Sequence, residues 1–231
     1  MLDLYHNNNQ RWFDENRHRY EQHVRQPMKA LAESLTGPLA SILPEYTNKV
    51  KVSRINNDVR FHAHKPPYKE YIWISFCAGT DSNAELFASI GRHGWSTGCK
   101  VDSPGREPLD DWRRNLLDNA DLWRRYWNAL GSRSGVQIHT EKGYKRPLFP
   151  NIPEDLMALV QAKGVWVYKD PKREFERGPE QDFLRGLCEI LPMYLFMVSG
   201  PGYLNCRLDR LVAETPPPDG ESAALWKMIK G

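Results

Sequence analysis

Several short motifs that identify common classes of protein are missing from this chain of 231 residues. It contains no Gly-x-Ser-x-Gly elbow, no Walker loop and no Gly-rich dinucleotide fingerprint, so the enzyme classes that depend on those motifs receive no support. Its four cysteines form no C-x-x-C pair, which argues against a zinc knuckle and against a dithiol redox site. We expect all four thiols to be reduced and most of them to be buried: Cys77, Cys99, Cys188 and Cys206.

Long apolar runs and flexible linkers are missing as well. No stretch of about 18 apolar residues is present, so the sequence predicts no transmembrane helix. The first residues lack the basic and apolar regions of a signal peptide, and we therefore expect a cytoplasmic protein without a membrane partner. Because no long Pro, Gly or Ser-rich linker interrupts residues 1–231, we expect a single globular domain with a substantial core.

Charge of either sign is not in large excess. The 32 Lys and Arg residues stand against 29 Asp and Glu residues, which gives a formal net charge of +3. A mildly basic chain permits an anionic ligand but does not require nucleic acid, which is the less favoured partner on this ground.

Hydrophobic periodicity divides the chain into three parts. Residues 1–45 repeat apolar side chains at helical spacing, and Pro27 is expected to kink this helix or to begin a second one. Residues 50–105 are rich in expected strands, among them an apolar run that starts at Tyr71. Residues 106–231 mix helices with short strands. This order predicts an α+β fold, with an antiparallel or mixed sheet covered by helices.

The segment from Arg54 to Lys69 carries the richest chemistry. In an extended strand, successive side chains point to opposite faces. One face would be apolar, with Ile55, Val59, Phe61 and Ala63, and the other would be polar, with Arg54, Asn56, Asp58, Arg60, His62 and His64. This division is typical of a strand with one face in the core and one face in a functional site.

The same segment resembles the signature of a known family, a bacterial domain of unknown function that also occurs in longer fungal proteins. That signature reads R-x-x-R-D-x-R-F and is followed by an Asp or Asn, a Lys and a Tyr. The matching residues here are Arg54, Asp58, Arg60, Phe61, Lys65 and Tyr68. Two further stretches match, one from Asn9 to Phe13 and one from Tyr144 to Pro147. The resemblance implies a shared site, but it implies no reaction.

Two positions depart from the family signature. Asn57 stands where the signature has its second Arg, and His64 stands where it has Asp or Asn. If the family site binds an anion through that Arg, this chain has lost one contact. His64 instead brings a group that titrates or that ligates a metal.

Positive charge dominates this segment and favours an anion. Asp58 lies between Arg54 and Arg60, so we expect a lowered pKa and assign it to orienting the arginines rather than to general base catalysis. A structural Arg–Asp–Arg ladder that pins the sheet to a helix is an equally weighted alternative. Phosphate or carboxylate would suit the predicted ligand-binding set of Arg54, Asp58, Arg60, Lys65, Lys69, Lys145 and Arg146, the last two if their loop lies nearby.

Three functions follow from these residues. The first is binding of, or action on, a phosphorylated or carboxylated small molecule, with Tyr68 or His64 as proton donor or acceptor. An enzyme is favoured, and its reaction class and oligomeric state stay open. The second is a metal-dependent enzyme, because His62, His64 and Asp58 share one face of the expected strand and suit a divalent cation.

The third is a non-enzymatic binding module, with nucleic acid as one partner. The expected helix after Pro108 mixes tryptophans with arginines, as proteins that bind single-stranded nucleic acid do. The tryptophans keep the spacing of a buried stripe, however, so the alternative that they form core, with the arginines on a solvated face, is favoured.

Overall fold

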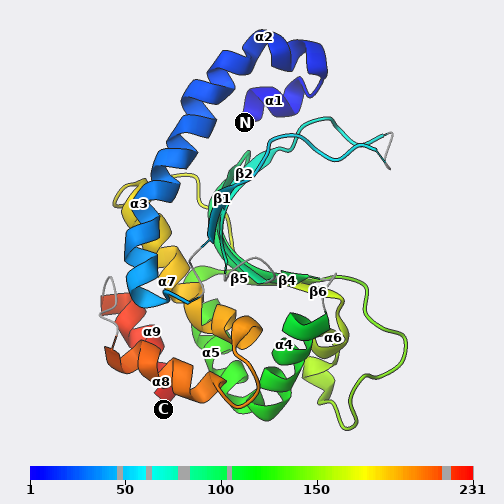
Figure 1. Cartoon of the computed structure of the whole chain (residues 1–231), viewed down its shortest axis with the longest axis vertical. Helices are drawn as coiled ribbons and strands as arrows, with labels where there is room; N and C mark the ends of the chain where they lie inside the picture. Colours follow the sequence, from blue (N-terminus) through cyan, green and yellow to red (C-terminus); the bar gives the residue numbers. More distant parts are fainter. Residues whose placement is uncertain (46–48, 61–63, 78–83, 103–105, 215–219, 231) are drawn as a thin grey trace.

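The computed structural model describes residues 1–45, 49–60, 64–77, 84–102, 106–214 and 220–230. Its centre is one strongly curved sheet, and most of the helices gather on the convex side of that sheet (Figure 1). The N-terminal helices continue past one end of the sheet, and the concave side faces away from the helical layer (Figure 1).

Six strands form the sheet in the order β1-β2-β3-β4-β6-β5, and each neighbouring pair is antiparallel. The strands are β1 (Lys49–Val52), β2 (Tyr71–Cys77), β3 (Ala84–Gly91), β4 (Gly94–Asp102), β5 (Val136–Thr140) and β6 (Gly164–Lys169). The predicted α+β fold is therefore confirmed, and the sheet is of the antiparallel kind. The strand-rich part of the sequence supplies four of these strands, and the mixed part supplies β5 and β6.

The chain begins with a short helix, α1 (Leu2–His6). A continuous helical segment follows, which consists of α2 (Gln10–Tyr20), the π-helical turn η1 (Glu21–Arg25) and α3 (Gln26–Ile42). Asn9 begins α2, because its side chain accepts a hydrogen bond of 3.0 Å from the backbone N–H of Trp12. Pro27 stands two residues after the end of η1, as the second residue of α3. Its ring would crowd the carbonyl four residues back in a regular helix, and the wider π-turn relieves this contact.

The remaining helices come from the second half of the chain. They are α4 (Arg106–Asp118), α5 (Ala120–Ser134), η2 (Glu154–Leu156), α6 (Met157–Gln161), α7 (Pro179–Val198), α8 (Leu204–Glu214) and α9 (Gly220–Lys230). Helix α7 crosses the convex face and, among the strands, contacts β4 and β3 most extensively. Among the helices that the structure describes, none has the length and apolar character that crossing a membrane requires.

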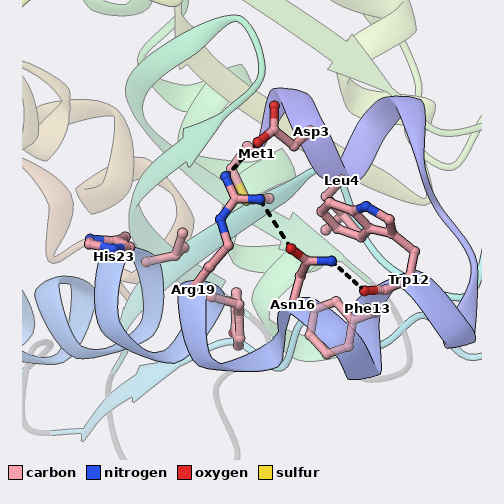
Figure 2. Close-up of a pocket in the computed structure, with 10 residues that line it drawn as sticks. Met1, Asp3, Leu4, Trp12, Phe13, Asn16, Arg19 and His23 are labelled. Atoms are coloured by element: carbon pink, nitrogen blue, oxygen red, sulfur yellow. Dashed lines mark hydrogen bonds and ion pairs between the residues drawn. The ribbon is translucent and has the colours of Figure 1, made fainter.

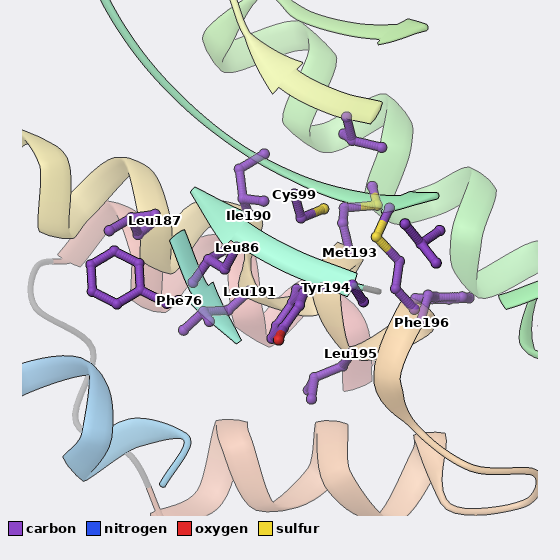
Figure 3. Packing of buried hydrophobic residues seen from close by; sticks show 14 of the residues in the cluster. Phe76, Leu86, Cys99, Leu187, Ile190, Leu191, Met193, Tyr194, Leu195 and Phe196 are labelled. Atoms are coloured by element: carbon purple, nitrogen blue, oxygen red, sulfur yellow. The ribbon is translucent and has the colours of Figure 1, made fainter. Parts of the chain in front are cut away.

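The main core lies between α7 and the convex face of the sheet (Figure 3). Ile72, Ile74 and Phe76 point into it from β2, and Leu187 and Leu191 line it from α7. All five side chains are fully buried. Burial of a side chain of this size stabilises the fold by about 1.5–3 kcal/mol relative to its exposure, so this layer supplies much of the hydrophobic driving force.

The segment from Arg54 to Lys69 does not form the single strand that the sequence predicts. Residues 53–60 and 64–70, here called the arm, leave β1 and return to β2, and only Asn56 and Tyr68 form an isolated antiparallel bridge. Pro66 and Pro67 donate no backbone hydrogen bond, which limits regular pairing. Val59, expected on the apolar face, is 42% exposed. Phe61, His62 and Ala63 lie outside the described residues.

A second, smaller core joins the arm to the N-terminal helices. It consists of Leu4, Phe13, Ile55 and Tyr68, all buried. The rings of Phe13 and Tyr68 stack with centroids 4.0 Å apart. Asn8 fastens the contact, because its side chain donates to the carbonyl of Tyr68 at 2.9 Å and accepts from the N–H of Tyr68 at 3.1 Å. Two of the stretches on which the family resemblance was based, Asn9 to Phe13 and Arg54 to Tyr68, therefore meet in one core.

Candidate functional site

Asp58 and Arg60 form an ion pair on the surface of the arm. Arg60 donates to both carboxylate oxygens, at 3.0 and 2.7 Å, and the two side chains are 54% and 77% exposed. The hydrogen bond from the Arg60 side chain lowers the pKa of Asp58 to about 2, as the sequence predicts. Arg54 forms no ion pair with the described residues, so this part of the structure contains no Arg–Asp–Arg ladder and no helix pinned beneath one.

The other signature residues of the arm separate into two environments. His64 and Lys65 are exposed. Tyr68 is only 4% exposed in the small core, and burial raises the pKa of its hydroxyl. A ring held in this way stabilises the arm, and its place in the core separates it from the exposed polar groups with which it was predicted to act.

Lys69 links the arm to the sheet. Its Nζ donates to the carbonyl of Arg54 at 2.7 Å and lies 4.7 Å from the centroid of the Trp73 ring. Burial lowers the pKa of Lys69, and the nearby charge of Lys65 lowers it further. The base of the arm therefore places a cation directly beside a ring on the concave face.

Lys145 and Arg146 lie at the other end of the sheet from the arm. The arm connects β1 and β2 at the end where Tyr71 pairs with Gly91. The loop that carries the two cations connects β5 and β6 at the end where Asp102 pairs with Gly164 (Figure 1). The structure does not bring this loop to the arm, because antiparallel strands send alternate connections to opposite ends of a sheet.

The predicted metal ligands do not come together in the part of the chain that the structure describes. There, no three His, Cys, Asp or Glu side chains are grouped closely enough to hold a metal ion. His64 and Asp58 are both exposed, and His62 lies outside the described residues.

The tryptophans and arginines after Pro108 are mostly engaged in structure. Trp112 and Trp123 are buried in the main core, as their spacing predicts. Arg113, expected on a solvated face, has a side chain only 3% exposed and donates to the carbonyls of Val160 and Ala162, both at 2.8 Å. The prediction of a solvated side chain was therefore wrong for Arg113, which instead links α4 to the end of α6. These helices therefore offer little free aromatic surface to a nucleic acid.

The concave face of the sheet holds chemistry that the sequence alone does not predict. Residues paired across antiparallel strands point to the same face, so the register fixes its membership. One row across the sheet contains Lys51, Ser75, Phe87, Gly98, Tyr168 and Gln137. The next row contains Lys49, Cys77, Lys100, Trp166 and His139, with Glu85 opposite Lys100. Aromatic and charged side chains from distant parts of the sequence thus share one open surface.

A pocket of about 300 Å³ occupies this concave face. Its lining consists of Tyr71, Trp73, Phe87, Ser89, Lys100 and Trp166. The Phe87 ring lies against the backbone of β4 at Gly98. A Cβ added to Gly98 would stand 2.5 Å from the Phe87 ring and 2.4 Å from the carbonyl oxygen of Val167. The missing side chain at Gly98 therefore lets the Phe87 ring form part of the pocket.

A polar network fixes the pocket beneath its rings. The indole N–H of Trp73 donates to Ser75 Oγ at 3.1 Å, and Ser75 donates to Glu85 at 2.8 Å. Lys100 lies 3.7 Å from Glu85 and 3.2 Å from Asp102. Its side chain is only 19% exposed, so these contacts hold its charge in place. Side chains ordered in this way lose little freedom when a ligand binds.

Cations without carboxylate partners border one side of the same face. The side chains of Lys49, Lys51, Arg54, Lys65 and Lys69 form no ion pair with any other residue that the structure describes. Glu85 and Asp102 are already paired with Lys100. The margin formed by β1 and the arm is therefore the positive side of the pocket.

Two other pockets lie beside the N-terminal helices, and His23 of η1 lines both. The smaller one, about 120 Å³, is closed on one side by Arg19, which bridges Asp3 and Asn16 (Figure 2). The larger one, about 530 Å³, includes Trp95, but this ring is 6% exposed and offers little surface to a ligand. The concave pocket combines four rings with a lysine that two carboxylates hold in place, and we regard it as the stronger candidate.

Fold and site together define an α+β protein with an antiparallel sheet, one face of which is open and rich in aromatic side chains. The chain belongs to the family described as a conserved hypothetical protein (DUF2461), which it matches over residues 1–191. This confirms the resemblance to a family of unknown function. The matched range includes the whole sheet and the arm, and it ends within α7. No curated protein and no solved structure matches the chain.

Proposed function

We propose that this protein binds a small anionic molecule that carries a planar ring, and that it does so on the concave face of its sheet. The observation that carries this proposal is the pocket lined by Trp73, Phe87 and Trp166, with Lys100 in its wall. A ring-bearing monophosphate such as a nucleoside monophosphate has both features that this pocket would recognise.

The rings supply the first part of the recognition. Aromatic side chains bind planar groups by stacking, and such contacts are worth about 1–3 kcal/mol for each base. Ser75 orients the Trp73 indole, and Gly98 leaves room for the Phe87 ring. Both rings are half-buried, so part of each remains available to a ligand.

The positive margin supplies the second part. Lys69 stands beside Trp73, and Lys51 lies on the same face two strands from Phe87. A phosphate directed toward this margin would meet cations that have no carboxylate partner among the described residues. This proposal keeps the anionic ligand that the sequence predicts, but it assigns the binding contacts to the sheet instead of the arm surface. Lys69 belongs to both sets of contacts.

An enzymatic role stays a prediction. In the pocket wall, Lys100 contacts two carboxylates, those of Glu85 and Asp102. These three are the residues to mutate first if a reaction is found, ahead of the buried Tyr68.

The test compares three ligands by isothermal titration calorimetry: adenosine monophosphate, ribose 5-phosphate without the base, and adenosine without the phosphate. We expect the complete nucleotide to bind more tightly than either fragment. We expect Trp73→Ala to weaken nucleotide binding about 5-fold or more, because one stacking partner is lost.

Tyr203→Ala is the matched control, since Tyr203 is a 63% exposed aromatic residue outside the pocket. Equal binding of the ribose 5-phosphate and the nucleotide would contradict the proposal. So would a folded Trp73→Ala protein that binds the nucleotide as tightly as the wild type does.

A further inference from the structure

We infer that the natural ligand of the concave face is single-stranded nucleic acid rather than a free nucleotide. This inference rests on the proposed function and extends it, because the features that would bind one nucleotide continue beyond the pocket. A single strand would cross the sheet with its bases on the aromatic side chains and its phosphates along the positive margin.

Aromatic surface continues from the pocket toward β5. The imidazole of His139 on β5 lies 5.5 Å from the Trp166 ring of the pocket. At the opposite margin the pocket ends on Tyr71, which is 52% exposed and whose ring lies 5.6 Å from the Trp73 ring. Tyr168 stands on the same face as Phe87, with only Gly98 between them in the register. Successive planar groups at this spacing are what a run of stacked bases requires.

The dimensions of the face fit a short oligonucleotide. Six strands give five gaps between neighbours, and at about 4.8 Å for each gap the sheet is about 24 Å wide along its surface. This width exceeds one nucleotide. It matches the lower end of the range for sheet-based single-strand binders, which cover about 4 or more nucleotides for each domain.

Charge is distributed along an edge rather than at a point. Lys49 and Lys51 of the edge strand β1 face the concave side, because they pair in register with Cys77 and Ser75 of β2. Lys69 extends this margin at the base of the arm, beside Trp73, and Arg54 and Lys65 add exposed positive charge on the arm itself. A line of cations follows a phosphate backbone better than it surrounds one phosphate group.

The curvature of the sheet favours a single strand over a duplex. The rings lie on the face of the sheet opposite the side chains that are buried in the main core, and the backbone curves so that this face is the concave one (Figure 1). There they can meet only bases that are unpaired and turned toward the sheet. A paired duplex presents its phosphates outward and keeps the base faces stacked inside. The same surface would therefore offer a duplex its cations but not its rings.

The experiment measures fluorescence anisotropy with labelled oligothymidylates of 2, 4, 8 and 12 nucleotides and with a 12-base-pair duplex. We expect affinity to rise by about 10-fold or more between the shortest and the longest single strand, and duplex binding to be weaker. If all five marginal cations contact phosphates, the logarithmic salt slope should approach about −3.5, at about 0.7 for each contact.

Charge variants separate backbone contacts from general attraction. The double variant Lys49→Gln and Lys51→Gln should make the salt slope shallower by about 1.4, at about 0.7 for each contact. The control double variant, Lys29→Gln and Lys227→Gln, removes two exposed lysines from helices α3 and α9, which lie away from the concave face (Figure 1). We expect the control to retain the wild-type slope.

The possible failures are distinguishable. If adenosine monophosphate binds but affinity does not rise with oligonucleotide length, the further inference is overturned and the proposed function stands. If neither nucleotide nor oligonucleotide binds, both fail. Duplex binding as tight as single-strand binding would overturn the inference. So would a dimer in sedimentation analysis that Trp73→Ala converts to monomer, because the face would then be an interface between two copies.

Discussion

On the convex face of the sheet, Ile72, Ile74 and Phe76 lie fully buried in the main core, whereas Trp73 of the same strand stays half-buried on the concave face. Both faces are rich in large apolar side chains. The convex face pairs each of them with a helix, while the concave face leaves ring surface open and adds lysines. Hydrophobicity alone therefore does not separate core from candidate site, and the distinction depends on which face the helices cover.

The largest expected effect is a loss of stability on the convex face. Phe76→Ala removes a fully buried ring from the main core, and we expect it to lower the free energy of unfolding by about 3–5 kcal/mol. Urea unfolding followed by far-UV circular dichroism measures this change.

Trp73→Ala is the matching substitution on the concave face, to be compared with Phe76→Ala. Trp73 lies between Ile72 and Ile74 in β2, but its side chain points to the opposite face. It should cost much less stability while it weakens nucleotide binding. A comparable loss of stability from both variants would break the comparison between a covered face and an open one.

The second largest effect is expected in the small core. Tyr68→Ala removes the ring that stacks on Phe13, and we expect a loss of about 2–4 kcal/mol, within the range of large-to-small core substitutions. Tyr68→Phe keeps the ring and should stay within about 1 kcal/mol of the wild type, because only the hydroxyl is lost. Thermal unfolding and nucleotide affinity are both measured for the wild type and for each of the two variants. A strong effect of Tyr68→Phe on ligand binding, with stability unchanged, would return the hydroxyl to the site.

Much of this architecture is predictable from the sequence, for physical reasons. Hydrophobic periodicity indicates the N-terminal helices, and the tryptophans after Pro108 keep the spacing of a buried stripe. The π-turn before Pro27 illustrates a limit: proline predicts an interruption there, but its form depends on local backbone geometry. Cys77, Cys99 and Cys188 are buried as expected, whereas Cys206 is exposed.

The concave site was not predictable in the same way. Trp73, Phe87 and Trp166 are distant in sequence, and they share a surface only because of strand order and register. A shift of one residue in any pair would move a ring to the other face. The prediction of a single strand in the arm failed for a related reason. The arm has the alternating pattern of a strand, but its prolines and its contacts with the N-terminal helices prevent regular pairing. Lys69 is the residue that both the sequence and the structure place at the candidate site.

A smaller effect is expected at Gly98, where the open face depends on a missing side chain. A Cβ at this position would clash with the Phe87 ring and with the carbonyl oxygen of Val167. We expect Gly98→Ala to cost about 1–3 kcal/mol, as overpacking usually does, and to displace Phe87 from the pocket. Urea unfolding and nucleotide titration test the two consequences separately.

Gly131→Ala is the matched control for Gly98→Ala, since nothing lies within 4 Å of a Cβ added at Gly131. This helical position should gain slightly in stability, because alanine favours helix. Unchanged nucleotide affinity in Gly98→Ala would show that the Phe87 ring is not part of the binding surface.

The smallest effect on stability is expected on the surface of the arm. The Asp58–Arg60 pair is exposed there, whereas the charge of Lys100 in the pocket is held between two carboxylates. The pKa of Asp58 lies at about 2, below its usual value, because Arg60 bonds to the carboxylate. A carboxyl group with a lowered folded pKa stabilises the fold above its unfolded pKa and loses that contribution as the pH falls through the folded value.

The stability difference between wild type and Asp58→Asn should therefore be small at pH 7, and it should vanish as the pH falls from about 4 to about 2. Thermal unfolding across this range measures it. Asp118→Asn, at an exposed aspartate without an ion pair among the described residues, is the control. A large stability loss at pH 7 would mean that the Asp58–Arg60 pair organises the arm. The arm would then resemble the ordered polar network beneath the concave pocket, and the contrast between arm and pocket would have to be abandoned.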